Sequence, residues 1–212
     1  MKVPLLTAVL LLPVPAAAAT VREARIAIAM SPKACEVTSR FAVDTATPGI
    51  LYHTLMLDRG GRPPVFSIVG AVAGRPEIIG RVARLPISLI GAGRNEYTVR
   101  YQVGSPAARD TCPLLVPVAA TDGLDRAVTI AVAAPAGAQR LPGDFPAFQW
   151  SGTHGRVTLG HVPSFVRVPH AVAGTELTWR DTIDPRRVID VAAIVTLACA
   201  SLVWAMVRRA RA

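Results

Sequence analysis

The segment NEYTVRYQV at residues 95–103 alternates strictly between apolar and polar side chains. Tyr97, Val99 and Tyr101 fall on one side of this pattern, and the residues between them are charged or hydrogen-bonding. A period of two is typical of a β-strand with one face on a core and the other in water. A helical period would bring Tyr97 and Tyr101 together but leave Val99 on the opposite side. The segment therefore predicts a half-buried antiparallel strand.

Two upstream segments, ARIAIAM at residues 24–30 and CEVTSRFAVD at residues 35–44, show the same alternation. Their expected inward side chains are Ile26, Ile28, Met30, Cys35, Val37, Phe41 and Val43. Weaker strand candidates lie at Ile50–Leu57, Val65–Val72, Glu77–Leu85, Leu114–Ala119, Ala127–Ala134, Arg156–Leu159, Ser164–Val168 and Glu176–Thr182. Gly, Pro and Asp turn signals separate them, and the 18 Pro and 16 Gly disfavour long helices. We predict a mainly β, antiparallel β-sandwich, immunoglobulin-like in general architecture only.

The two ends of the chain are apolar. Residues 1–19 combine Lys2, a short apolar run and a row of alanines, the pattern of a secretory signal peptide. Residues 188–207 form an apolar run long enough for one C-terminal transmembrane helix, and residues 208–212 form a basic tail. A translocated N-terminus would place that tail in the cytoplasm. We therefore expect a single-pass protein of a bacterial inner membrane, with its N-terminal domain in the periplasm or outside.

Between these ends we predict one exported domain at residues 20–182, followed by a short juxtamembrane spacer at residues 183–187. The Pro- and Gly-rich stretch at residues 135–146 is a candidate sub-boundary. Residues 147–182 could then form a separate module. We prefer one domain, because the C-terminal portion alone offers too little apolar surface to fold independently.

The chain is basic, with a formal net charge of +9, and its densest group of arginines spans residues 75–100. That group comprises Arg75, Arg81, Arg84, Arg94 and Arg100. Such a surface suits anionic lipid headgroups or an acidic partner, although a compositional preference for Arg over Lys also accounts for it. Export makes nucleic acid an improbable partner.

Two cysteines, Cys35 and Cys112, lie in the expected exported domain, whereas Cys199 lies within the apolar C-terminal run. Disulfides form and persist in oxidising compartments, so we predict one bridge between Cys35 and Cys112. The alternative is two buried free thiols. A CxxC motif is absent from the sequence, which gives thiol–disulfide catalysis little support.

Within the predicted membrane helix, Asp190 is the one acidic residue. It either pairs with Arg186 at the headgroup level or contacts another membrane helix. Ala192, Thr196 and Ala200 form a row of small residues at helical spacing, which is compatible with close helix packing and with a homo-oligomer formed through this helix.

The sequence contains no recognisable catalytic motif, and we predict no catalytic residues and no cofactor. His154, His161 and His170 are weak metal candidates, because their spacing differs from compact zinc patterns. An exported copper or zinc domain built on them is one alternative function. An envelope hydrolase using loop acids such as Asp144 is a further and weaker alternative.

Aromatic residues gather in a Pro-rich region as Phe145, Phe148, Trp150 and Phe165. Such a group either forms a contact surface for a protein or saccharide, or caps the core or touches the membrane interface. Together with the short spacer and the minimal tail, these features favour a membrane-anchored binding or accessory domain. Its expected partner is the membrane together with another envelope or membrane protein.

Overall fold

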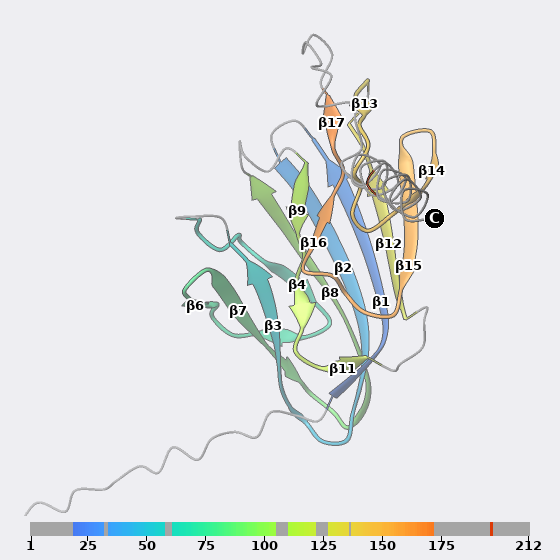
Figure 1. Ribbon diagram of the computed structural model, residues 1–212. Coiled ribbons are helices and arrows are strands. Elements are labelled where there is room, and N and C mark those ends of the chain that lie inside the picture. Colours follow the sequence, from blue (N-terminus) through green and yellow to red (C-terminus); the bar gives the residue numbers. More distant parts are fainter. Residues whose placement is uncertain are drawn as a thin grey trace, which may run out of the picture.

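The computed structural model describes residues 19–31, 34–57, 61–104, 110–121, 127–135, 137–171 and 196. In these residues the chain is mainly β and forms several sheets, as the alternating segments predict (Figure 1). The predicted spacer, the cytoplasmic tail, Asp190, Ala192 and Ala200 lie outside the described residues, as does the strand predicted at Glu176–Thr182. Of the predicted membrane helix only Thr196 is described, as helical and exposed.

The larger sheet has the strand order β14-β15-β12-β1-β2-β8-β4, with β11 also pairing with β1. Its strands are β1 (Ala19–Met30), β2 (Ala34–Thr45), β4 (Ser67–Val69), β8 (Gly93–Gly104), β11 (Ala120–Thr121), β12 (Val128–Ala133), β14 (Gln149–Ser151) and β15 (His154–Leu159). In Figure 1 the long strands β1, β2 and β8 run side by side through the centre. β1 begins at Ala19, which the sequence analysis assigned to the signal peptide.

The smaller sheet has the order β10-β3-β7-β5, with β6 also pairing with β7. Its strands are β3 (Gly49–Met56), β5 (Val72–Ala73), β6 (Glu77–Ile79), β7 (Val82–Leu89) and β10 (Val116–Pro117). Two short ribbons complete the described fold: β9 (Thr111–Pro113) with β16 (Phe165–Arg167), and β13 (Gln139–Arg140) with β17 (His170–Ala171).

The larger sheet is mixed rather than purely antiparallel, which corrects the sequence prediction. β1 runs parallel to β12 over six residue pairs, from Ala24 opposite Val128 to Ala29 opposite Ala133. Alternation of side chains sets the faces of a strand but not its direction, so the sequence pattern carried no signal for this pairing. β15 pairs with β12, and therefore residues on both sides of the stretch 135–146 belong to one sheet.

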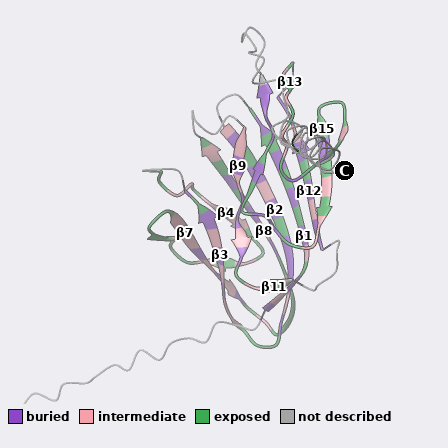
Figure 2. Cartoon of the chain, in the orientation of Figure 1, coloured by how far each residue is buried: buried purple, intermediate pink, exposed green. Residues whose placement is uncertain are grey.

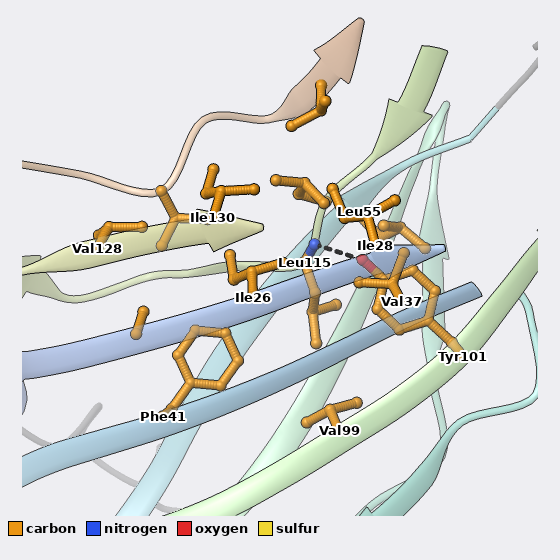
Figure 3. Packing of buried hydrophobic residues seen from close by; sticks show 14 of the residues in the cluster. Ile26, Ile28, Val37, Phe41, Leu55, Val99, Tyr101, Leu115, Val128 and Ile130 are labelled. Carbon is orange, nitrogen blue, oxygen red and sulfur yellow. Dashed lines mark hydrogen bonds between the residues drawn. The ribbon is translucent and has the colours of Figure 1, made fainter. Parts of the chain in front are cut away.

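One cluster of buried hydrophobic residues is formed by strands of both sheets. Figure 2 shows buried positions on strands of both sheets. Figure 3 shows the large-sheet residues Ile26, Val37 and Phe41 in the same cluster as Leu55 of the smaller sheet. The predicted inward positions of β1 and β2 are all buried. Ser39 is also fully buried, because it continues the same period of two between Val37 and Phe41.

Glycines explain why two predicted strands are interrupted. The segment predicted at Val65–Val72 is divided into β4 and β5 around Gly70, which has a φ of +89°. A Cβ there would lie 2.6 Å from the carbonyl oxygen of Glu96, so a larger residue would collide with β8. The segment predicted at Glu77–Leu85 folds instead as a hairpin of β6 and β7, which turns at Gly80 with a φ of +61°.

Among the residues that the structure describes, none belongs to a helix with the length and apolar character that a membrane crossing requires.

Candidate functional site

The four aromatic residues predicted as a binding surface separate into two pairs. The rings of Phe145 and Phe165 lie 5.2 Å apart, and both side chains are exposed, by 40% and 38%. Phe148 and Trp150 form the second pair, at 5.7 Å. Phe148 is buried and Trp150 is half-buried, with its indole nitrogen donating a hydrogen bond to Asp144 at 2.7 Å. Only Phe145 and Phe165 therefore offer an accessible contact surface.

Phe145 and Phe165 stand at one side of an open groove of about 450 Å³. Phe145 is held there by a pair of backbone hydrogen bonds to Arg167 of β16, and Phe165 lies opposite Pro113 of β9. The groove is lined mainly by apolar side chains: Met56, Val82, Leu114, Val116, Phe145, Val162, Pro163 and Phe165, together with Thr54, His161 and Ser164. We call this feature the aromatic groove.

The aromatic groove opens onto the outer face of the smaller sheet. Leu51, His53 and Leu55 of β3 are buried, and the alternate residues point away from the core. The register places these outward residues in rows. Across the strands, Val82 lies between Met56 and Ile79, and Ser88 lies between Ile50 and Val72. Tyr52 lies opposite Pro86, and a further row contains, in order, Val116, Thr54, Arg84 and Glu77.

Most of these outward side chains are apolar, although a water-facing sheet surface normally carries polar residues. Met56 and Ile79 are 49% and 60% exposed. Val118, whose amide donates to the Tyr52 carbonyl, is also exposed. An exposed apolar surface of this kind marks an interaction site more often than a solvated face.

The arginines of residues 75–100 divide between the two sheets. Arg94 binds Glu96 of its own strand at 3.0 Å, and Arg40 of β2 binds the same carboxylate at 2.8 Å. The hydrogen bond from Arg40 lowers the pKa of Glu96 below its ordinary value. Arg75 and Arg81, by contrast, lie beside the smaller sheet and are exposed.

Arg84 lies on the outer face of the smaller sheet, with its guanidinium carbon 3.5 Å from the centre of the Tyr52 ring. Among the ion pairs of the described residues, none involves Arg75, Arg81 or Arg84. The guanidinium groups of Arg75, Arg81 and Arg84 therefore have no carboxylate partner among the described residues, whereas Arg40 and Arg94 on β2 and β8 are paired with Glu96.

The three candidate metal-binding histidines do not come together. His154 is exposed in β15 beside Thr153, and His161 is exposed and lines the aromatic groove. His170 is buried in β17, with its Nδ1 3.0 Å from the Val168 carbonyl oxygen and 3.5 Å from the Asp110 carboxylate. Within the described part of the chain, no group of three His, Cys, Asp or Glu side chains is arranged to hold a metal ion.

Cys35 and Cys112 meet in the core, although they are 77 positions apart in the sequence. Both are buried as free thiols, and the Cys112 thiol lies within hydrogen-bonding reach of Cys35. This contact and burial raise the pKa of the Cys112 thiol well above its ordinary value. The geometry places β9 of one short ribbon directly against β2 of the larger sheet.

A buried polar contact joins the two sheets. His53 of β3 is fully buried, with Nε2 3.0 Å from the Tyr97 hydroxyl of β8 and its ring 5.1 Å from that of Phe41. Burial lowers the pKa of His53 to about 3, so the imidazole stays neutral in the folded protein. The alternation of β3 places His53 on the inward face together with Leu51 and Leu55, and it is fully buried there rather than at the surface.

A second depression, of about 520 Å³, lies on the outer face of the larger sheet. It is lined by the small outward residues of β1 and β12, Ala27, Ala29, Ala131 and Ala133, and by polar residues that include Glu36, Gln149, His154 and Arg156. It contains His154 but neither of the other two candidate histidines.

Comparison with known proteins gives no family. No protein-family model matches the chain, and no curated protein matches its sequence. Native leukotriene A4 hydrolase from Saccharomyces cerevisiae is 10% identical with a TM-score of 0.41, over 71% of this chain and 29% of that one. The M1 zinc metallopeptidase from Deinococcus radiodurans is 11% identical with a TM-score of 0.35, over 77% of this chain and 50% of that one. This chain therefore spans half or less of the length of these proteins, and scores this low assign it no activity.

Proposed function

We propose that this protein is a single-pass, membrane-anchored envelope protein that presents a binding or accessory domain to a membrane or periplasmic complex. The domain would be a β-sandwich, immunoglobulin-like in general architecture, held at the inner membrane by residues 188–207 with its C-terminus in the cytoplasm. Two sheets around one shared core support the sandwich assignment. The apolar C-terminal run of the sequence supports the anchor.

The observation that carries the binding role is the aromatic groove. Phe145, Phe165 and Met56 are large apolar side chains that remain exposed around a concave, mainly apolar surface. Aromatic side chains that are half-exposed beside such a groove are typical anchors for a protein partner. Among the described residues, no group of three His, Cys, Asp or Glu side chains offers a competing metal site.

Photo-crosslinking in intact membranes tests this role. A photoreactive amino acid at Phe165 should give adducts with another envelope or membrane protein, whereas the same group at Thr98, on the outer face of β8, should give few or none. Equal adducts from both positions, or recovery of lipid alone from Phe165, would contradict the proposed role of the groove. Adducts between two copies of this chain would show that the groove contacts a second copy in a homo-oligomer and not a different protein.

We further propose that Cys35 and Cys112 form a disulfide in the exported protein. The two buried thiols are close enough to influence each other's pKa, and a bridge between them requires such proximity. A disulfide-donating oxidase would accept the two electrons and two protons by thiol–disulfide exchange and would itself be reduced to a dithiol. Such a bond would fix β9, and through it the Leu114–Val116 wall of the aromatic groove, to the larger sheet.

A further inference from the structure

The outer face of the smaller sheet combines exposed aliphatic side chains with arginines that have no carboxylate partner among the described residues. We propose that this face docks on an anionic phospholipid surface. The inference deepens the proposed function, because it rests on an anchor that keeps the domain close to a bilayer. It names the membrane itself as the partner of a surface that continues from the aromatic groove and shares Met56 and Val82 with it.

The apolar part of this surface follows from the register. Ile79 of β6 lies opposite Val82 of β7, which in turn lies opposite Met56 of β3. At the other end of the sheet, Val72 of β5 and Ile50 of β3 lie on either side of Ser88. Side chains of this size lower their free energy when they enter the boundary between headgroups and acyl chains.

The charged part of the surface decides between a lipid and a neutral apolar partner. Arg75 lies between β5 and β6, Arg81 lies in the turn before β7, and Arg84 lies on the face itself. Glu77, opposite Arg84, is the one acidic residue among residues 61–90. A surface with excess arginine and exposed aliphatics complements phosphodiester groups above acyl chains, since guanidinium binds phosphate in a planar, bidentate manner.

Electrostatic attraction to the headgroups would be appreciable but reversible. A basic side chain near an anionic bilayer contributes about 1 kcal/mol, which corresponds to about a fivefold change in a docking equilibrium. Removal of both Arg75 and Arg81 should therefore weaken docking by about 25-fold if the two contributions add. The effect should decline with added salt, because the groups are exposed and their interactions are screened.

The experiment uses the full chain in vesicles, with an environment-sensitive fluorophore on an Ile79→Cys variant. Cys199 is replaced by Ala, and the buried Cys35 and Cys112 are protected by the fold. The emission should shift to the blue in vesicles containing phosphatidylglycerol but not in phosphatidylcholine alone. Arg75→Gln with Arg81→Gln should largely remove the shift.

The matched control is Arg100→Gln with Arg156→Gln, which removes the same charge from exposed positions on the larger sheet. This control should keep the shift. Equal emission in neutral and anionic vesicles, or an equal loss in both double variants, would overturn the lipid proposal. Crosslinking of the labelled face to an acidic protein, with no response to lipid, would also overturn it.

Flotation of the same samples separates this proposal from the proposed function. Recovery of the chain with neutral vesicles reports the membrane anchor, whereas the emission of the label reports docking of the face. A chain that floats with neutral vesicles but shows no lipid-dependent shift contradicts only the docking. A chain that floats with anionic vesicles alone and shows the shift supports the docking and contradicts the anchor.

Discussion

The two sheets share one core but present different outer surfaces. On β2 and β8 the outward side is largely charged or polar, and Arg40, Glu96 and Arg94 form a connected set of ion pairs. On β3 and β7 the outward side is largely apolar, and nearby arginines lack a carboxylate partner among the described residues. Both sheets contribute buried residues to the one core. The difference between the outer faces is the reason for the docking that we propose for the smaller sheet.

A large effect, comparable with that of a core truncation, is expected from breaking the covalent link that we propose between the larger sheet and β9. Reduction of the Cys35–Cys112 disulfide should lower the free energy of unfolding by about 4 kcal/mol, because the bond closes a long loop in the unfolded chain. Denaturant unfolding with and without reductant measures this difference. A Cys35→Ala, Cys112→Ala variant should not respond to reductant, and alkylation of both cysteines in the unreduced wild type would refute the bond.

Substitutions on inner and outer faces should sharpen the contrast. Phe41→Ala removes a fully buried ring that contacts both sheets and should cost about 3–5 kcal/mol. Ile79→Ala removes an exposed side chain and should cost less than about 1 kcal/mol. Chemical denaturation of the two variants in detergent compares them. Similar costs would mean that Ile79 belongs to the core, which would remove the reason for assigning its face to a ligand.

The buried contact between the sheets predicts a pH dependence. The pKa of His53 is lowered to about 3 in the fold, whereas an unfolded histidine titrates near 6.5. Between these values the unfolded state binds more protons, so stability is complete above pH 6.5 and declines as the pH falls. At pH 4.5 the loss should be roughly 2–3 kcal/mol.

His53→Gln should flatten this dependence between pH 6.5 and 4.5, even if it lowers stability at every pH. His154→Gln, at an exposed position of β15, should leave the dependence as in the wild type. Unfolding measured across this range distinguishes the two variants. If His53→Gln kept the wild-type slope, another group would be responsible.

The smallest effect is expected at the charged surface of the larger sheet. Glu96→Gln removes the ion pairs with Arg40 and Arg94, but all three side chains are largely exposed. Exposed ion pairs contribute about 0–1 kcal/mol, so stability should change by less than that and the change should shrink in salt. A loss above about 2 kcal/mol would show that these charges, like the core, determine the fold.

The sequence predicted the larger sheet better than the smaller one for a physical reason. Where one face of a strand is exposed to water, as in β8, the alternation of polar and apolar residues identifies both the strand and its buried side chains. Ile50, Tyr52 and Met56 of β3 are apolar on the outward side, so the pattern there is weaker. The weaker alternation of β3 is itself a sequence signal of an apolar outer surface on the smaller sheet.

The candidate site was only partly predictable. The sequence identified the aromatic region as a whole. Its spacing could not show that Phe145 and Phe165 meet, because they are brought together by the backbone pairing of Phe145 with Arg167. Nor could it show that Phe148 and Trp150 turn inward. A disulfide between Cys35 and Cys112 was predicted from compartment and number, and it stays a prediction, because the two residues are free thiols in the structure. The parallel pairing of β1 with β12 and the division of the arginines between the sheets depend on tertiary structure alone.

Oxidative footprinting of the full chain tests the central claim, that the smaller sheet and its groove face a partner. Met56, Phe145 and Phe165 are exposed and chemically reactive, so hydroxyl radicals should modify them in detergent. In native membranes their modification should fall several-fold, while exposed His154 on the larger sheet should react equally in both. Unchanged modification of Met56, Phe145 and Phe165 in native membranes would contradict the account.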